Sequence, residues 1–193
     1  MIERESVRLG HLVENTLDFS RIESGRKRYR MEVMPAKQFL ERIVEHFLAF
    51  TDGQGLTLTP LLSADLPKIK VDGQAFTQAI LNLLDNAVKY SPGEKLLEFG
   101  AKSKGDYLVI TVKDHGIGIP KTELTNIFDK FYRVEMTAGT NVPGSGIGLT
   151  LVKEIVEAHG GRVEVKSEPN HGSAFSIYVP IVREEQHAAD TDR

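Results

Sequence analysis

The sequence contains no cysteine and no tryptophan among its 193 residues. The lack of cysteine excludes disulfides, zinc–thiolate sites and thiol nucleophiles. No apolar run approaches the roughly 20 residues of a membrane-spanning helix. The charged start, residues 1–5, has no apolar segment behind it, unlike a secretory signal. We therefore expect that this segment itself does not insert into a membrane, which leaves open that it belongs to a longer membrane protein.

A charge excess of one sign is also missing. The chain has 24 Lys and Arg against 27 Asp and Glu, a net charge of −3. Without a basic excess, we do not expect a nucleic-acid partner. Hydrophobic residues make up 40% of the chain, which is typical of a globular protein. The length suits one domain with a small appendage.

The order of predicted elements indicates the fold class. Apolar periodicity predicts helices over residues 2–24, 35–50, 72–90 and 146–159, and a shorter helical region that ends at residue 133. Strands are predicted near residues 56–61, 69–71, 95–102, 106–114, 162–167 and 173–180. These elements favour an α+β fold: a two-layer α/β sandwich with a mixed, mostly antiparallel sheet, helices on one face, and a long N-terminal helix in front. We expect the helix to occupy residues 1–25, a hinge and first strand 26–34, the domain 35–182, and a disordered tail 183–193.

A polar line borders the apolar stripe of the predicted helix 72–90. Asn82, Asn86, Lys89 and Tyr90 follow at steps that share one helix face. Asparagine oxygens can ligate a hard cation such as Mg²⁺, and a nearby lysine can meet phosphate. A solvated helix face would show the same pattern, so the line needs support from other motifs.

A second candidate site follows a β-branched strand. Asp114 stands at the strand end, and Gly116 and Gly118 come directly after it. Glycines let a ligand approach the backbone, and the carboxylate can accept a hydrogen bond from an exocyclic amine such as that of adenine. An ordinary Asp-x-Gly turn is the alternative.

A third candidate precedes the predicted helix 146–159. Gly144, Gly146 and Gly148 are closely spaced there, and free N–H groups at a helix start suit phosphate. The segment is no Walker motif, because Ser145 and Gly146 stand where Lys and Ser or Thr are required. It is no dinucleotide fingerprint either, since the third glycine comes one residue early. The catalytic-loop motif of Ser/Thr kinases is absent.

Together, the motifs have a specific order. Residues 82–90, 114–118, 127–133 and 144–148 resemble the N, first glycine, F and second glycine boxes of sensor histidine kinases. Those kinases have the Bergerat-type ATP-binding fold that is shared with gyrase and mismatch-repair ATPases. The resemblance covers roughly residues 32–181, and Phe128 and Phe131 in the F box favour the histidine kinases over the other branches.

The resemblance implies a protein histidine kinase that uses ATP or ADP with Mg²⁺. Asp114 would read the adenine amine, while Asn86, with Asn82, would hold the metal. The implied nucleotide-binding set comprises Asn82, Asn86, Lys89, Tyr90, Asp114, Gly116, Gly118, Ile119, Lys130, Gly144, Ser145, Gly146, Gly148 and Leu149. The implied catalytic residues are Asn82, Lys89, Lys130 and Arg133. Phe128 and Phe131 would pack the base of a lid formed by residues 134–145.

Residues 1–25 resemble the second helix of the dimerisation and phosphoacceptor hairpin in these kinases. The family's acceptor motif, His-Glu-x-x-Thr/Asn-Pro, does not occur in the sequence, and His11 lies in the wrong helix for it. We therefore expect that this chain alone does not phosphorylate itself. The implied partners are the phosphoacceptor hairpin of the parent kinase, a response regulator receiver domain, and a second copy in a parent homodimer.

Two other functions stay open at this point. One is a related ATPase of the same fold, such as a Ser-directed anti-sigma kinase, which would leave acid-stable phosphoserine on a partner. The other is a non-catalytic fragment that binds nucleotide or docks a partner, which normal partner binding without ATP binding would indicate.

Overall fold

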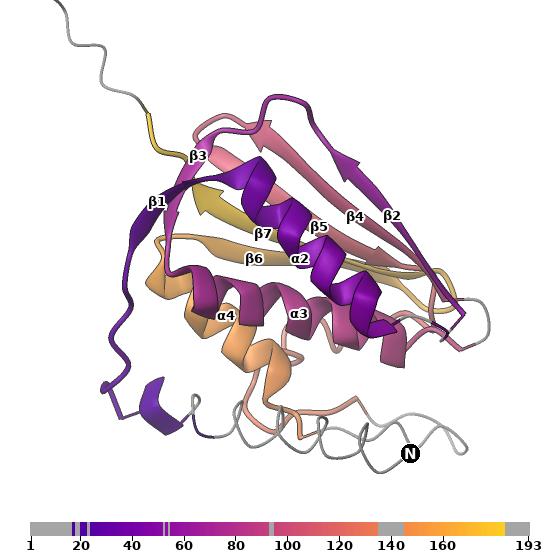
Figure 1. The fold of residues 1–193 in the computed structure, drawn as a ribbon. Helices are drawn as coiled ribbons and strands as arrows, with labels where there is room; N and C mark the ends of the chain where they lie inside the picture. Colours follow the sequence, from indigo (N-terminus) through magenta and orange to yellow (C-terminus); the bar gives the residue numbers. More distant parts are fainter. Residues whose placement is uncertain are drawn as a thin grey trace, which may run out of the picture.

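The computed structural model describes residues 17, 20–22, 24–51, 53, 55–92, 95–134 and 145–183. Helices α2, α3 and α4 cover one face of a five-stranded sheet (Figure 1). The elements are β1 (Glu32–Pro35), α2 (Ala36–Thr51), β2 (Leu56–Leu62), β3 (Lys68–Val71), α3 (Gly73–Lys89), β4 (Lys95–Lys104), β5 (Tyr107–Asp114), α4 (Gly148–Ala158), β6 (Arg162–Glu168) and β7 (Gly172–Pro180). The predicted two-layer arrangement is confirmed.

The sheet is mixed and mostly antiparallel, as predicted. Its strand order is β2-β4-β5-β7-β6, and β2 pairs with β4 in parallel while the other neighbours are antiparallel. Strand β1 stands apart from this sheet and pairs antiparallel with β3. A single bridge from Ile69 in β3 to Ile181 connects this small ribbon to the chain beyond β7.

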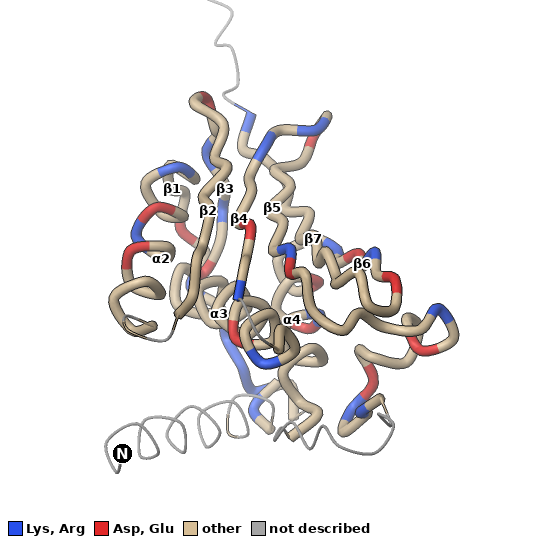
Figure 2. The backbone as a smooth tube through the Cα atoms, turned by 90° about the vertical axis from the view of Figure 1, so that its right-hand side faces the viewer, with Lys and Arg blue, Asp and Glu red and all other residues tan. Residues whose placement is uncertain are grey.

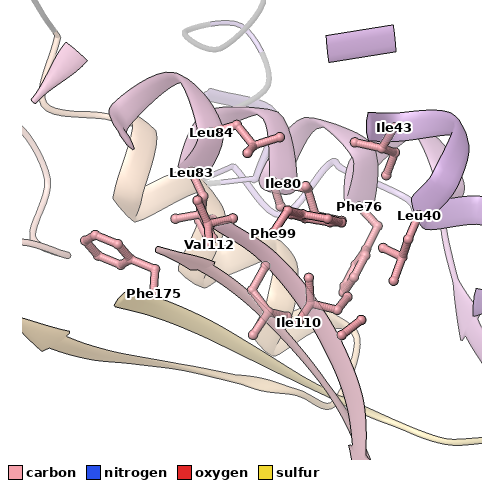
Figure 3. Packing of buried hydrophobic residues seen from close by; sticks show 14 of the residues in the cluster. Leu40, Ile43, Phe76, Ile80, Leu83, Leu84, Phe99, Ile110, Val112 and Phe175 are labelled. Carbon is pink, nitrogen blue, oxygen red and sulfur yellow. The ribbon is translucent and has the colours of Figure 1, made fainter. Parts of the chain in front are cut away.

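Helix α3 is the element that the sequence predicts best. Asp72 caps its start by accepting a hydrogen bond from the Ala75 N–H at 3.0 Å. The predicted apolar stripe is buried and includes Phe76, Ile80, Leu83, Leu84 and Ala87. Figure 3 shows this stripe packed against Phe99 and Val112 of the sheet. The packing places the polar line of α3 at the margin of the core.

The predicted helical region before residue 133 is wrong. Residues 121–131 form successive turns, in which the N–H groups of Glu123, Asn126 and Asp129 donate to carbonyls three residues earlier. The ring of Phe128 packs edge-on against Phe175 of β7, with centroids 6.4 Å apart. Tertiary packing of the segment onto the sheet therefore outweighs its helical propensity.

The predicted N-terminal helix can be followed only near its end. Residues 17 and 20–22 are helical, and the N–H of Arg26 donates to the Arg21 carbonyl beyond the last turn. Gly25 has a φ of 64°, so the predicted helix end at this glycine is confirmed. The remainder of that helix, residues 135–144 of the expected lid, and the tail from residue 184 lie outside the described residues. The proposed domain boundaries stay predictions.

Charges are interspersed along the described chain, and Figure 2 shows acidic and basic residues side by side on α2. None of the described helices is long and apolar enough to cross a membrane.

The hinge after the N-terminal helix is attached to the core by a buried histidine. His159, at the end of α4, lies edge-on to the rings of Tyr29 and Phe76, at centroid distances of 5.0 and 5.4 Å. Its Nδ1 lies 2.6 Å from the Ile155 carbonyl, and its Nε2 accepts from the Asp72 N–H at 2.9 Å. These partners require a neutral ring protonated at Nδ1. The Asp72 carboxylate in turn accepts from the Arg30 N–H in the hinge, at 2.8 Å.

We expect the stability of the domain to fall as the pH drops below about 6.5, the ordinary pKa of histidine. Burial lowers the pKa of His159, against smaller opposing effects of the Ile155 carbonyl and the Asp72 carboxylate. Below that pH the unfolded chain takes up a proton that folded His159 does not, so the free energy of unfolding decreases. Urea unfolding at several pH values below about 6.5 measures the slope of the free energy of unfolding against pH.

His159→Gln should flatten that slope, whereas His46→Gln on the exposed side of α2 should keep it. Equal slopes in the wild type and His159→Gln would contradict the assignment. Asp72 does not interfere in this window. Burial raises its pKa, but hydrogen bonds from backbone N–H groups and the nearby His159 lower it on balance, so its contribution is lost only at pH below about 3.9.

Candidate functional site

The fold brings the four predicted motifs together in a chain of contacts. The carbonyl of Tyr90, at the end of α3, accepts a hydrogen bond from the Ile117 N–H at 3.1 Å. On the same helix, Asn82 Oδ1 lies 3.6 Å from the position that a Cβ on Gly148 would take. The Gly146 carbonyl accepts from the Phe131 N–H at 3.1 Å. Segments far apart in the sequence thus form one continuous site.

Asp114 is the most buried charged group of the site. Its side chain ends β5, and the residue is 4% exposed. Oδ1 accepts hydrogen bonds from the N–H groups of Gly116 at 2.9 Å and Ser173 at 3.2 Å. Burial raises the pKa of Asp114, and these hydrogen bonds and the neighbouring His115 counteract the increase. Both of these hydrogen bonds from described residues engage Oδ1, which leaves Oδ2 to accept from a ligand.

Gly116 and Gly118 are required by the protein's own packing. A Cβ on Gly116 would lie 2.0 Å from the Tyr90 carbonyl oxygen. Gly118 has a φ of 67°, and a Cβ there would lie 2.0 Å from the Glu168 carbonyl oxygen. The space that each glycine leaves is therefore occupied by backbone of this chain, and the two glycines shape the loop after Asp114 rather than an open cavity.

The polar line of α3 lies where the sequence predicts it. Asn82, Asn86 and Tyr90 are half-buried along the helix, and Lys89 is exposed. Lys89 Nζ lies 3.6 Å from the carboxylate of Asp85 one turn earlier, as an exposed ion pair of little stabilising value. The side chain of Asn86 forms no hydrogen bond with another described residue, so its amide is available to a ligand.

The segment that leads into the expected lid has two different faces. Phe128 packs on Phe175 of β7, whereas Phe131 is 65% exposed. Residues 135–144 of the expected lid lie outside the described residues, so the packing of Phe131 at the lid base stays a prediction. Phe131 has a φ of 62°, which is unusual for a bulky residue, and Lys130 and Arg133 are exposed beside it.

The start of α4 completes the described part of the site. Gly148 begins the helix, Leu149 is half-buried in its first turn, and no described side chain caps the helix start. Ser145 is exposed and its Oγ lies 3.4 Å from the Ile147 N–H. The hydroxyl of Thr150 is buried without a hydrogen-bond partner among the described residues. Gly144 lies outside the described residues, so its place in the site stays a prediction.

The sequence analysis missed the contribution of the β6–β7 hairpin. Ser167 Oγ accepts from the Ile119 N–H at 2.8 Å, and Ser173 donates to Asp114 as described above. Neither serine belongs to a recognised motif here, and a serine in a strand gives no periodic signal. Tyr132 also donates to Glu123, which ties the ends of the turn segment together.

The side chains of His115 and Asp114 lie on opposite faces of the sheet although the residues are adjacent. Its Nε2 lies 3.1 Å from Glu98 Oε1, which also accepts from Lys113 Nζ at 2.6 Å. Glu98 pairs with Lys113 in the strand register, whereas Asp114 pairs with Leu97. Side chains alternate across a strand, so His115 joins the face opposite to the Asp114 carboxylate. Among the described residues, no group of three or more histidine or acidic residues is arranged to hold a metal ion.

Comparisons with known proteins place this geometry in a family context. Residues 71–183 match the family described as histidine kinase-, DNA gyrase B- and HSP90-like ATPases. The sensor protein kinase WalK of Staphylococcus haemolyticus is 34% identical over 179 residues, covering 91% of this chain and 29% of its own length. The alginate biosynthesis sensor protein KinB of Pseudomonas aeruginosa is 31% identical over 180 residues, covering 93% of this chain and 30% of its own length. The chain thus spans less than a third of these relatives.

Solved structures agree with these matches. The mycobacterial sensor histidine kinase MprB is 25% identical and has a TM-score of 0.67, with 80% of this chain and 100% of that one covered. Full-length ShkA in complex with AMPPNP, also 25% identical, has a TM-score of 0.77 and covers 92% of this chain and 36% of its own.

Proposed function

From the membership of this chain in the histidine kinase-, DNA gyrase B- and HSP90-like ATPase family, as the ATP-binding catalytic domain of a sensor histidine kinase, we propose that it binds Mg²⁺-ATP where its four motifs meet. The observation that carries the proposal is the chain of contacts from Tyr90 to Ile117, from Asn82 to Gly148, and from Phe131 to Gly146. Through these contacts, segments that are distant in the sequence form one continuous surface.

The adenine end of the site is assigned to Asp114. Its Oδ1 is held by two backbone N–H groups, so the carboxylate is fixed in orientation before a ligand arrives. The free Oδ2 can accept a hydrogen bond from an exocyclic amine, and burial strengthens that bond relative to one in water. An ionised acceptor of this kind selects an amine over a carbonyl.

The phosphate end is assigned to α3 and to the start of α4. No described side chain caps the start of α4, whose N–H groups and positive dipole end suit an anion. Asn86, with Asn82, offers amide oxygens, which suit a Mg²⁺ ion that takes its other ligands from phosphate and water. The buried Thr150 hydroxyl, which has no partner among the described residues, also lies in the first turn of α4. These groups fit a magnesium-bound triphosphate.

Exposed cations would complete the charge balance. Lys89 would exchange its weak contact with Asp85 for phosphate, and Lys130 and Arg133 stand on the segment that leads into the lid. Phosphoryl transfer requires positioning and charge neutralisation more than covalent chemistry from the protein. Bound Mg²⁺ would supply charge neutralisation at the phosphates. These residues therefore orient the nucleotide as a phosphate donor.

In the parent protein, the acceptor of the γ-phosphate would be a histidine on the dimerisation and phosphoacceptor hairpin. A response regulator receiver domain would take the phosphate next, and the parent would act as a homodimer. Since ATP is the donor, we place the domain on the cytoplasmic side of any membrane that the parent crosses.

Asn86→Ala should weaken the binding of Mg²⁺-ADP tenfold or more, or about 1.4 kcal/mol. The substitution removes an amide oxygen that the proposal assigns to the metal and leaves the apolar stripe of α3 intact. Isothermal titration calorimetry measures the affinity, with and without Mg²⁺. The loss should shrink when Mg²⁺ is chelated, because the amide then has no metal to ligate.

Gln74→Ala provides the control for this experiment. Gln74 is an exposed amide at the other end of the same helix, and its removal should leave the affinity unchanged. Wild-type affinity in Asn86→Ala would remove this residue from the site, and a wild-type chain that binds no nucleotide would refute the proposed function.

A further inference from the structure

The tip of the β6–β7 hairpin, residues 167–173, contacts the loop that follows Asp114. The Ser173 N–H donates to Asp114 Oδ1 at 3.2 Å, and the Asn170 N–H donates to the Ile117 carbonyl at 2.7 Å. Gly118 approaches the Glu168 carbonyl so closely that no side chain fits between them. The hairpin and the loop therefore form a seam of backbone contacts, roughly 50 residues apart in the sequence.

Ser167 is the side chain at the centre of this seam. Its Oγ lies 2.8 Å from the Ile119 nitrogen, 2.9 Å from the Gly172 carbonyl oxygen and 2.9 Å from Ser173 Oγ. The carbonyl of Gly172 only accepts, so the Ser167 hydroxyl donates to it. The Ile119 N–H and the Ser173 hydroxyl then donate to Ser167 Oγ. All donors and acceptors of this half-buried hydroxyl are satisfied.

We propose that Ser167 is a positioning residue for nucleotide recognition, which acts through the Asp114 loop without touching the nucleotide. The proposal rests on the assignment of Asp114 to the adenine amine. Ser167 holds both ends of the loop: Ile119 directly, and Asp114 through Ser173, whose N–H donates to the carboxylate. The hairpin thereby fixes the direction in which Asp114 Oδ2 points.

The consequence of losing this hydroxyl is local. Ser167→Ala leaves the Ile119 N–H and the Ser173 hydroxyl without this acceptor at a half-buried position. The loop then gains freedom, and the carboxylate must be ordered again by the ligand, which costs affinity. Because the effect is confined to the base-reading end, binding through the phosphates should be preserved.

Calorimetric titration of Mg²⁺-ADP, Mg²⁺-GDP and Mg²⁺-tripolyphosphate tests the proposal. Ser167→Ala should weaken ADP about three- to tenfold, the size expected for one hydrogen bond. The ratio of the ADP affinity to the GDP affinity should also decrease, and the affinity for tripolyphosphate should not change. Ser167→Thr, which keeps the hydroxyl, should restore the ADP affinity. Exchange of the Ile119 amide with solvent, followed by NMR, should accelerate in Ser167→Ala and not in Ser167→Thr.

Ser176→Ala is the matched control. Ser176 lies on β7 and shares one hydrogen bond with Thr111 at 3.0 Å, in a cross-strand pair away from the Asp114 loop. The control loses a serine hydroxyl of similar burial but should keep the affinity for ADP and the selectivity over GDP.

Equal losses of affinity for ADP and tripolyphosphate in Ser167→Ala, or equal losses of ADP affinity in both serine variants, would overturn the positioning role. A wild-type chain that binds tripolyphosphate but neither ADP nor GDP would overturn the assignment of Asp114, and this inference with it. If the wild type binds ADP and Ser167→Ala binds it equally well, the inference alone fails.

Discussion

Asp114→Asn is expected to weaken nucleotide binding tenfold or more while the domain stays folded. The amide oxygen of asparagine can keep the Oδ1 position, where the Gly116 and Ser173 N–H groups hold it. The other position then carries an NH₂ group, which cannot accept a hydrogen bond from the adenine amine and opposes it donor to donor. The buried ligand contact is left unpaired, which costs more than the loss of an exposed one.

Calorimetry with Mg²⁺-ADP measures this change, and circular dichroism during thermal unfolding shows whether the fold persists. Asp65→Asn, in the exposed turn between β2 and β3, makes the same chemical change away from the site and should bind as the wild type does. Unchanged affinity in Asp114→Asn would exclude Asp114 as the adenine acceptor.

The second large effect concerns stability. Leu40→Ala on α2 should lower the free energy of unfolding by about 2–5 kcal/mol, because it removes a fully buried side chain and leaves a cavity. Figure 3 shows Leu40 beside Phe76 in the core. For a chain of this size, each kcal/mol shifts the melting temperature by about 2–4 °C. Urea unfolding measures the free energy directly.

Leu48→Ala is the matched substitution, two turns further along the same helix. Leu48 is 39% exposed, so its removal should cost less than about 1 kcal/mol. Both substitutions change helix propensity equally, so their difference isolates burial. Similar losses in the two variants would contradict the placement of the core. Below its melting temperature, Leu40→Ala should keep its nucleotide affinity, in contrast to Asp114→Asn.

The regular elements of the fold could be predicted because their side chains repeat. Helix α3 has an apolar residue at nearly every step that faces the sheet, and β5 contains a β-branched run over residues 109–112. The turn segment after residue 120 shows the limit of this reasoning. Its shape is set by the packing of Phe128 on Phe175 and by the Tyr132–Glu123 contact, and such contacts leave no pattern in the local sequence.

Some residues of the candidate site could likewise be predicted from the sequence, and others could not. Asn86, Asp114 and the glycines could be selected because ligand chemistry requires those residue types at that spacing. The hairpin serines could not be, because Ser167 acts on backbone groups almost 50 residues away. The structure also separates the adjacent residues His115 and Asp114, because His115 lies beside Glu98 on the face opposite to the Asp114 carboxylate. Only three-dimensional pairing distinguishes a ligand-binding residue from one that supports it.

The strand order of the sheet has a consequence for synthesis of the chain on the ribosome. Strand β7 lies between β5 and β6, yet it is the last of the described strands to be made. Until it emerges, β5 has an open edge and β6 has no partner in the sheet. The Asp114 carboxylate also lacks one of its N–H donors until Ser173 arrives. The candidate site is therefore completed only after β7 has left the ribosome, and a nascent chain that stops before β7 exposes unpaired strands instead.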